Sequence, residues 1–136
     1  MSRGFPLIEA RITRKFSAQH SLPQFGNPDL HWHDYVATIG YRHEIAPTLG
    51  ATKGLGDMLS AVDPVIARVS GAVLNDLFAA HPTAEFLALW MLRELPGYID
   101  YVEIHAYEVL TVRASRNQAR FEWLDWKIGQ PVPEAM

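Results

Sequence analysis

The sequence predicts an α+β domain: a four-stranded antiparallel sheet with two helices on one face. Apolar and polar residues alternate in two segments before residue 45 and in two segments after residue 99, as expected for half-buried strands. Between these segments the apolar residues recur at helical spacing. Because strands and helices are grouped rather than interleaved, we expect antiparallel pairing and a helical layer over one face of the sheet.

The first two predicted strands are residues 7–20 and 30–42. From Ile8 to Ile12 every second residue is apolar, so one face of the first strand is buried. Residues 23–29 between the strands are rich in turn formers. We therefore expect the two strands to form an antiparallel hairpin.

The first helical segment spans residues 57–80, after a loop over residues 46–56 that is rich in glycine and proline. Asp63 and Pro64 form a helix start signal, because an acidic N-cap followed by proline suits the first turn. Gly71 is expected to bend or break this segment.

The second helix is expected to open at Pro82 and to stop before the Pro-Gly pair at residues 96–97. It is apolar nearly all round, which is typical of a buried helix. The last two strands are predicted at residues 100–112 and 119–128, with a turn at residues 114–118.

Length and charge limit the class of protein. A chain of 136 residues corresponds to one domain, residues 1–136, and a hydrophobic content of 49% excludes disorder. The net charge of -3 argues against a nucleic-acid partner. No segment approaches the roughly 18 apolar residues of a membrane span, and the start lacks the basic-then-apolar order of a signal peptide.

The sequence contains no cysteine. Disulfides, thiolate metal sites and thiol nucleophiles are therefore excluded, and a cytoplasmic location is expected.

Three of the six histidines form a candidate metal site. His31 and His33 lie two residues apart on the second predicted strand, so their side chains leave the same face about 7 Å apart. His20 ends the preceding strand, and strand pairing would bring it beside them. Three nitrogen ligands with no fourth protein ligand are typical of a catalytic Zn²⁺ site with an open position. The alternative is that these are ordinary strand histidines bonded to their neighbours.

These histidines belong to a longer pattern. Residues 16–20 read Phe-Ser-Ala-Gln-His, and residues 30–33 read Leu-His-Trp-His. This resembles the zinc motif of the 6-pyruvoyltetrahydropterin synthase and 6-carboxytetrahydropterin synthase family, in which an aromatic residue, small residues and a histidine precede His-Gly-His on the next strand. Further pieces recur in the family's order: Leu74-Asn75, Pro82-Thr83-Ala84-Glu85 and Tyr107-Glu108.

The resemblance implies a T-fold, with four strands and two helices in each subunit, and a homo-oligomer built from trimers that usually stack into a hexamer. It implies a Zn²⁺ cofactor held by His20, His31 and His33. The implied substrate is dihydroneopterin triphosphate, and the implied reaction is of the carbon–oxygen lyase type, with loss of triphosphate.

The resemblance also assigns substrate-binding residues. Glu108 matches the family glutamate that holds the amino-pyrimidinone edge of the pterin, and Thr83 and Glu85 fall in the substrate-binding motif. The sequence gives a separate reason for Glu108, because on the predicted strand it shares an apolar face with Val102 and Ile104, where an unpaired charge is costly. A solvent-facing glutamate is the alternative.

The chain departs from the family where proton transfer is expected. Asn27 stands where many members have a cysteine, and residues 70–72 (Ser-Gly-Ala) stand where the family has an Asp-His pair. An amide and small residues cannot act as a general base near neutral pH. Histidine is the side chain best suited to take up and release a proton near neutral pH, so His81 is the candidate catalytic base. The alternative is a solvent-facing histidine ahead of a helix.

Three functions follow from these observations. The first is a zinc-dependent pterin-synthase-like lyase that has diverged in substrate or base. The second is a cyclase of the Pictet–Spengler type, which condenses an amine with an aldehyde in specialised metabolism. The third is a non-catalytic pterin- or zinc-binding protein. The three-histidine pattern argues against this function, because structural zinc sites normally have four protein ligands.

Overall fold

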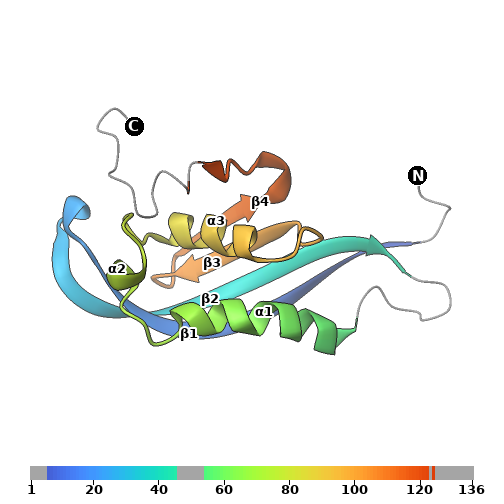
Figure 1. Cartoon of the computed structure of the whole chain (residues 1–136), viewed down its shortest axis with the longest axis horizontal. Helices are drawn as coiled ribbons and strands as arrows, with labels where there is room; N and C mark the ends of the chain where they lie inside the picture. Colours follow the sequence, from blue (N-terminus) through green and yellow to red (C-terminus); the bar gives the residue numbers. More distant parts are fainter. Residues whose placement is uncertain (1–5, 46–53, 123, 125–136) are drawn as a thin grey trace.

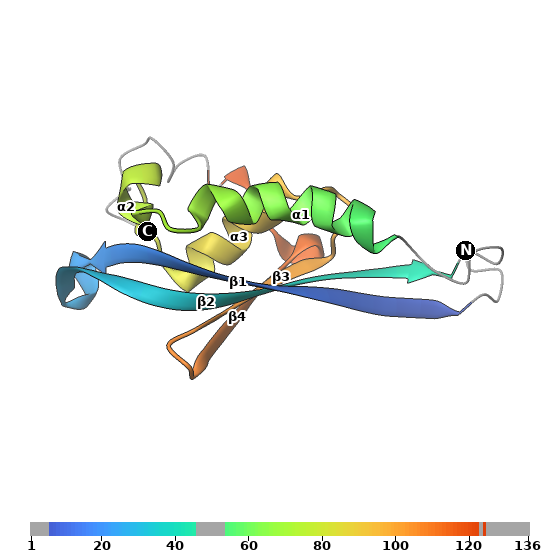
Figure 2. The same ribbon diagram turned by 90° about the horizontal axis from the view of Figure 1, so that it is seen from below.

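A computed structural model describes residues 6–45, 54–122 and 124 of the chain. The strands form a single antiparallel sheet in the order β1-β2-β3-β4, and the α-helices lie on one side of it (Figures 1 and 2). This confirms the predicted fold class, with one short helix more than expected. The elements in chain order are β1 (Leu7–Leu22), η1 (Pro23–Phe25), β2 (Asn27–Glu44), α1 (Leu55–Val69), α2 (Leu74–Leu77), α3 (Ala84–Glu94), β3 (Tyr101–Ala106), β4 (Leu110–Ser115) and η2 (Arg116–Gln118).

The hairpin of β1 and β2 is the longest feature of the sheet. Its pairing runs from Leu7 opposite Glu44 to Leu22 opposite Asn27. Strand β3 covers only residues 36–40 of β2. The two ends of the hairpin therefore extend past the β3–β4 pair, and the end near η1 packs against α2 and the segment that leads into α3.

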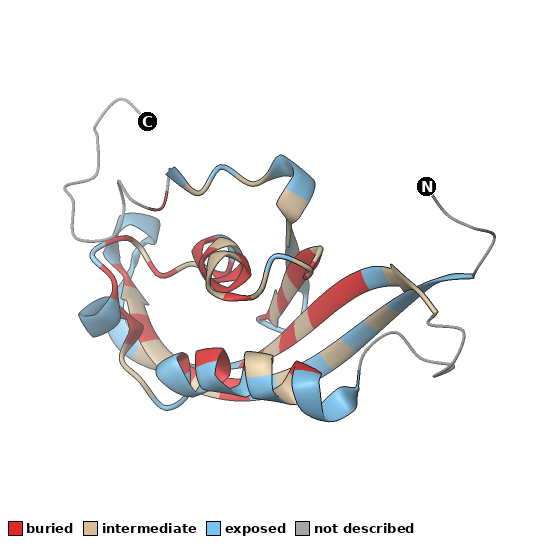
Figure 3. Cartoon of the chain, turned by 45° about the vertical axis from the view of Figure 1, so that its right-hand side comes forward, coloured by how far each residue is buried: buried red, intermediate tan, exposed pale blue. Residues whose placement is uncertain are grey.

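The core lies between the sheet and the helices. Figure 3 shows the buried faces of strands and helices turned toward one another. Within the part of the chain that the structure describes, no helix combines the length and apolarity needed to cross a bilayer. The core side chains include Phe16, Tyr35 and Ile39 from the sheet, Val62 and Val69 from α1, Leu87 and Met91 from α3, and Ile104 from β3.

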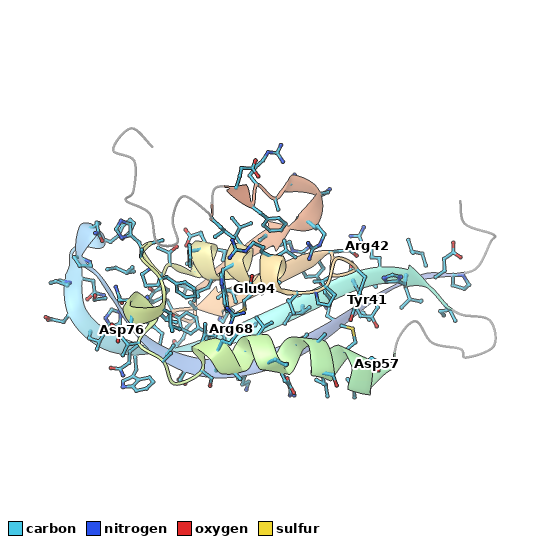
Figure 4. All side chains as sticks on the ribbon, viewed as in Figure 1. Tyr41, Arg42, Asp57, Arg68, Asp76 and Glu94 are labelled. Carbon is cyan, nitrogen blue, oxygen red and sulfur yellow. The ribbon has the colours of Figure 1, made fainter. Side chains whose placement is uncertain are left out.

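An ion pair joins the two long helices. Arg68 of α1 donates to Glu94 of α3 at 2.6 Å, and Figure 4 shows the two side chains meeting between the helices. Partial burial opposes ionisation of Glu94, but its hydrogen bonds to Arg68 and Arg93 outweigh this effect and lower the pKa of its carboxyl. The pair links α1 to α3 above the sheet.

Helix α1 begins at Leu55, so the predicted start at Asp63-Pro64 is wrong. Pro64 lies inside the helix, and Asp63 instead accepts two hydrogen bonds from Arg14 of β1, both at 2.7 Å. The apolar face of α1 packs on the sheet, which outweighs the hydrogen bond that proline cannot donate. Gly71 follows the helix with a φ of 75°, which confirms the predicted break. Residues 46–53 of the predicted loop lie outside the described residues.

Helix α3 begins at Ala84, two residues later than predicted. Thr83 is its N-cap, and the Thr83 hydroxyl accepts a hydrogen bond from the backbone N–H of Phe86 at 3.1 Å. The helix ends at Glu94, ahead of the Pro-Gly pair at residues 96–97, and it is buried as expected.

The last hairpin differs from the prediction. The segment predicted as one strand over residues 100–112 is divided into β3 and β4 by a turn at residues 107–109. Residues 114–118 are not the hairpin turn, and residues 119–122 and 124 form no strand. The turn carries no glycine or proline: Tyr107 and Glu108 adopt left-handed backbone conformations, with φ of 58° and 64°. Residues 123 and 125–128 lie outside the described residues.

Gly40 allows β2 to pack closely against β3. A Cβ atom at this position would overlap the ring of Tyr101. That ring is buried, and the Arg113 guanidinium stacks on it at 3.8 Å from the centroid. The ring therefore has little room to move away from an added methyl group.

We expect Gly40→Ala to destabilise the fold by about 1–3 kcal/mol, because the added carbon overpacks this contact. Gly56→Ala is the matched control. A Cβ at Gly56 meets nothing within 4 Å, and alanine favours the helix by up to about 1 kcal/mol. Chemical denaturation of both variants measures the difference, and equal stability of the two would contradict the assigned packing.

Candidate metal centre

The pairing of β1 with β2 brings His20, His31 and His33 together. His20 pairs with His31 across the hairpin, and His33 lies two residues farther along the same face. The ring centroids are 4.6–4.8 Å apart. One nitrogen from each ring lies within 4.8 Å of the others, a spacing that can hold a metal ion. The predicted convergence of the three side chains is therefore observed.

Two of the three rings are oriented by backbone carbonyls. His20 Nδ1 lies 2.9 Å from the carbonyl oxygen of Pro82, and His31 Nδ1 lies 2.8 Å from that of Asp29. Donation from each Nδ1 to a carbonyl leaves Nε2 free to bind a metal ion, as is usual for histidine ligands. His20 is fully buried, so its orientation is fixed by packing as well.

The third ring has a buried nitrogen that lacks a partner. His33 Nε2 is inaccessible to solvent and makes no hydrogen bond within the described residues. A buried polar atom without a partner is costly. A cation between the three rings would satisfy this nitrogen, so the residues fit a metal ion.

The protonation states of His33 and His20 also favour metal binding. The pKa of His33 is lowered to about 4, chiefly by burial and then by the nearby His20 and His31, and the attraction of Asp34 only partly opposes these effects. Burial lowers the pKa of His20 as well, against the raising effect of the Pro82 carbonyl. Neutral imidazole is the form that coordinates metals, so these two rings need not lose a proton near neutral pH.

Tyr107 closes one side of the cluster. Its hydroxyl lies 3.4 Å from His20 Nε2, and its ring centroid lies 4.2 Å from that of His33. Burial raises the pKa of the Tyr107 hydroxyl, and the negative charge of Glu85 raises it further. The sequence pattern does not predict this placement, because it indicates one continuous strand through residues 107–109. The length of the predicted strand, 13 residues, was the available signal that a turn interrupts it.

The predicted substrate-binding residues lie around this cluster in different environments. Thr83 caps α3 directly after Pro82, whose carbonyl holds His20. Glu85 is exposed in the first turn of α3. Glu108 is exposed in the β3–β4 turn, so the expectation that it extends from an apolar strand face is wrong.

His81 directly precedes Pro82, the residue whose carbonyl contacts His20. Its half-buried ring packs edge-on against Phe25, with the centroids 6.4 Å apart. No contact joins the His81 side chain to the three central histidines within the described residues. The structure brings the neighbouring Pro82, and not His81, against His20.

The structure also shows where Asn27 and residues 70–72 lie, the two places that lack the expected proton-transfer residues. Asn27 Nδ2 lies 3.4 Å from His31 Nε2, so this amide stands beside the cluster. Residues 70–72 run along the outer edge of β1, where the Gly71 N–H donates to the Ser17 carbonyl and the Gln19 N–H donates to the Ala72 carbonyl. Neither position supplies a general base.

A cleft of about 300 Å³ near the start of β3 is not part of this cluster. Arg42, Arg113 and Arg116 line it, and no histidine does. Arg113 pairs with Glu103 at 2.8 Å, and Arg116 donates to three backbone carbonyls. Arg42 pairs with Glu9 at 3.0 Å, so all three cations have partners. Among the described residues, the group that could hold a metal ion is the set of three histidines.

The fold and the cluster define a class: small α+β proteins with a three-histidine site on the first hairpin of an antiparallel sheet. A sequence model of the 6-pyruvoyl tetrahydropterin synthase family matches residues 9–123, and the chain belongs to this family. The structure of 6-pyruvoyl tetrahydropterin synthase from Caenorhabditis elegans is similar, with a TM-score of 0.76 and 22% sequence identity over 82% of this chain and 96% of that chain. At 22% identity, this similarity shows that the two proteins share a fold and nothing more. No curated protein matches the chain.

Proposed function

We propose that the chain is a zinc-dependent enzyme of the pterin-synthase type that acts on a pterin or a similar heterocycle. The first candidate substrate is dihydroneopterin triphosphate. The observation that carries the proposal is the set of three Nε2 atoms: two belong to rings oriented by backbone carbonyls, and the third is buried without a partner. Family membership supports a pterin-synthase-like activity.

Zinc bound by His20, His31 and His33 would supply a Lewis acid that polarises hydroxyl and carbonyl oxygens of the substrate. The Pro82 and Asp29 carbonyls keep two of the rings in position. Full burial of His20 excludes water from that side of the cluster.

The residues around the cluster suit an N–H-rich heterocycle. Glu108 and Glu85 are exposed carboxylates, and a carboxylate can accept two parallel hydrogen bonds from an amino-pyrimidinone edge. The Thr83 hydroxyl accepts from Phe86, which leaves its own proton free to donate to a ligand. We assign the anchoring role to Glu108, with Glu85 and Thr83 as further substrate contacts.

Proton transfer differs from the family pattern in this proposal. Asn27 stands beside His31, and residues 70–72 are paired with β1, so a base must come from elsewhere. His81 is our candidate, because it directly precedes the Pro82 that holds His20. The same observations favour the second candidate function, a cyclase that joins an amine to an aldehyde, because that reaction needs less proton transfer on a pterin.

We further propose that the chain works as a homo-oligomer, a trimer or a hexamer, in the cytoplasm. Strand β4 pairs only with β3, so its outer edge presents unpaired backbone groups within the described part of the chain. Such edges are normally covered by another strand or chain. The native mass in solution measures the number of subunits.

Zinc-loaded protein should convert dihydroneopterin triphosphate to a tetrahydropterin with loss of triphosphate, as detected by mass spectrometry. His33→Ala should abolish turnover and zinc binding while the protein stays folded. His105→Ala is the matched control, because the His105 ring lies away from the cluster and is hydrogen-bonded to Thr111 on β4. This variant should keep both turnover and zinc binding. No product from folded, zinc-loaded protein would exclude the lyase, and amine and aldehyde substrates would then test the cyclase.

Glu108→Gln should raise KM at least about tenfold, because the amide cannot accept both hydrogen bonds of the heterocycle edge. The stability should change little, since Glu108 is exposed. Steady-state kinetics and thermal unfolding measure the two effects. An unchanged KM would refute the anchoring role.

A further inference from the structure

The segment between α1 and α3 lies along the outer edge of β1, near the tip of the first hairpin (Figures 1 and 2). The Gly71 N–H donates to the Ser17 carbonyl at 2.7 Å, and the Gln19 N–H donates to the Ala72 carbonyl at 2.9 Å. Gln19 also forms a parallel bridge with Val73. This stretch therefore pairs with β1 as a short parallel strand would, on the edge that faces away from β2.

Asn75 extends this pairing along β1 with its side chain. The backbone turns into α2 at Leu74, so it does not follow β1 farther. In its place the Asn75 side chain accepts a hydrogen bond from the Ser21 N–H at 2.8 Å and donates one to the Ser21 carbonyl at 3.1 Å. The amide has one acceptor and one donor in the right arrangement to bond both backbone groups of Ser21, as a neighbouring strand would. Leu74 is fully buried, which anchors α2 in the core.

Ser21 lies where the pairing of β1 with β2 is irregular. The register shifts between His20 and Leu22, and within the described residues Ser21 is opposite no residue of β2. The regular ladder therefore ends at His20, opposite His31. Beyond this point the backbone that follows His20 is held from the other edge of β1, by Asn75.

We propose that Asn75 is a positioning residue of the metal centre: it fixes the backbone next to His20 and so keeps the His20 ring beside the other two histidines. This inference rests on the proposed zinc centre. His20 is then held at two points, because its Nδ1 bonds the Pro82 carbonyl and the residue that follows it bonds Asn75. Within the described residues Asn75 makes no hydrogen bond to the three rings, so it acts through His20 and leaves the fourth position of the zinc ion open.

The test compares Asn75→Ala with Asp76→Ala. Asn75 is exposed, so its replacement leaves no cavity in the core. Asp76 is the next residue of α2 and is labelled in Figure 4; it is exposed as well, and its carboxylate makes no hydrogen bond or ion pair within the described residues. Two readouts are used without substrate: the zinc dissociation constant, from competition with a chelator, and the exchange with solvent of the His20 Nδ1 proton in the metal-free protein, from NMR. Circular dichroism checks that each variant is folded.

Asn75→Ala should weaken zinc binding about tenfold, the lower end of the effect of residues that orient metal ligands, because the freed backbone lets the His20 ring leave its position. The His20 Nδ1 proton should exchange faster by a similar factor. Asp76→Ala should match the unaltered protein in both measurements. A lower melting temperature of Asn75→Ala with unchanged zinc binding would overturn the proposal, because Asn75 would then have a structural role alone. Equal weakening in Asp76→Ala would also overturn it.

The Ser21 amide of the unaltered, metal-free protein provides a second test that does not depend on how a variant folds. The proposal expects the Ser21 N–H to exchange at least about tenfold more slowly than in an unstructured peptide of the same sequence, because Asn75 accepts its hydrogen bond. Exchange at the peptide rate would overturn it. The NMR measurements need no metal. A protein that binds no zinc would therefore refute the zinc centre, whereas the effect of Asn75 on His20 is decided separately.

Discussion

The antiparallel register of β1 and β2 is the constraint on which the rest of the structure depends. It places His20 opposite His31 and directs both, with His33, to the face that the helices cover. Side chains of a strand alternate between faces, so a slip of one residue would turn a whole strand's set to the other face. The register is held by the core as well as by the site, because Phe16 stacks on Tyr35 across the same hairpin at 4.9 Å.

Residues outside the β1–β2 hairpin also contact the histidine cluster. The carbonyl of Pro82, directly before the cap of α3, accepts from His20, so the start of this buried helix also orients a candidate ligand. The β3–β4 turn adds Tyr107 from a third part of the chain. The cluster therefore joins segments separated by more than 80 residues, and it forms only when the sheet and helices are packed.

The sequence was sufficient to predict the parts of the site that depend on local periodicity. His31 and His33 share a face because strand residues alternate, and His20 joins them through simple hairpin pairing. Tyr107 and Glu108 were not predictable in the same way, because neither residue is typical of the positive φ that it adopts. Pro64 was misassigned as a helix start because tertiary packing of α1 outweighed a local signal.

The central claim is that the ε-nitrogens of three histidines form a zinc centre. X-ray absorption at the zinc edge of the purified, zinc-loaded protein tests it most directly, together with the zinc content per chain. We expect one zinc ion per chain, with three imidazole ligands at about 2.0–2.1 Å. Zinc in less than stoichiometric amount, or a ligand shell with fewer than three imidazoles, would contradict it.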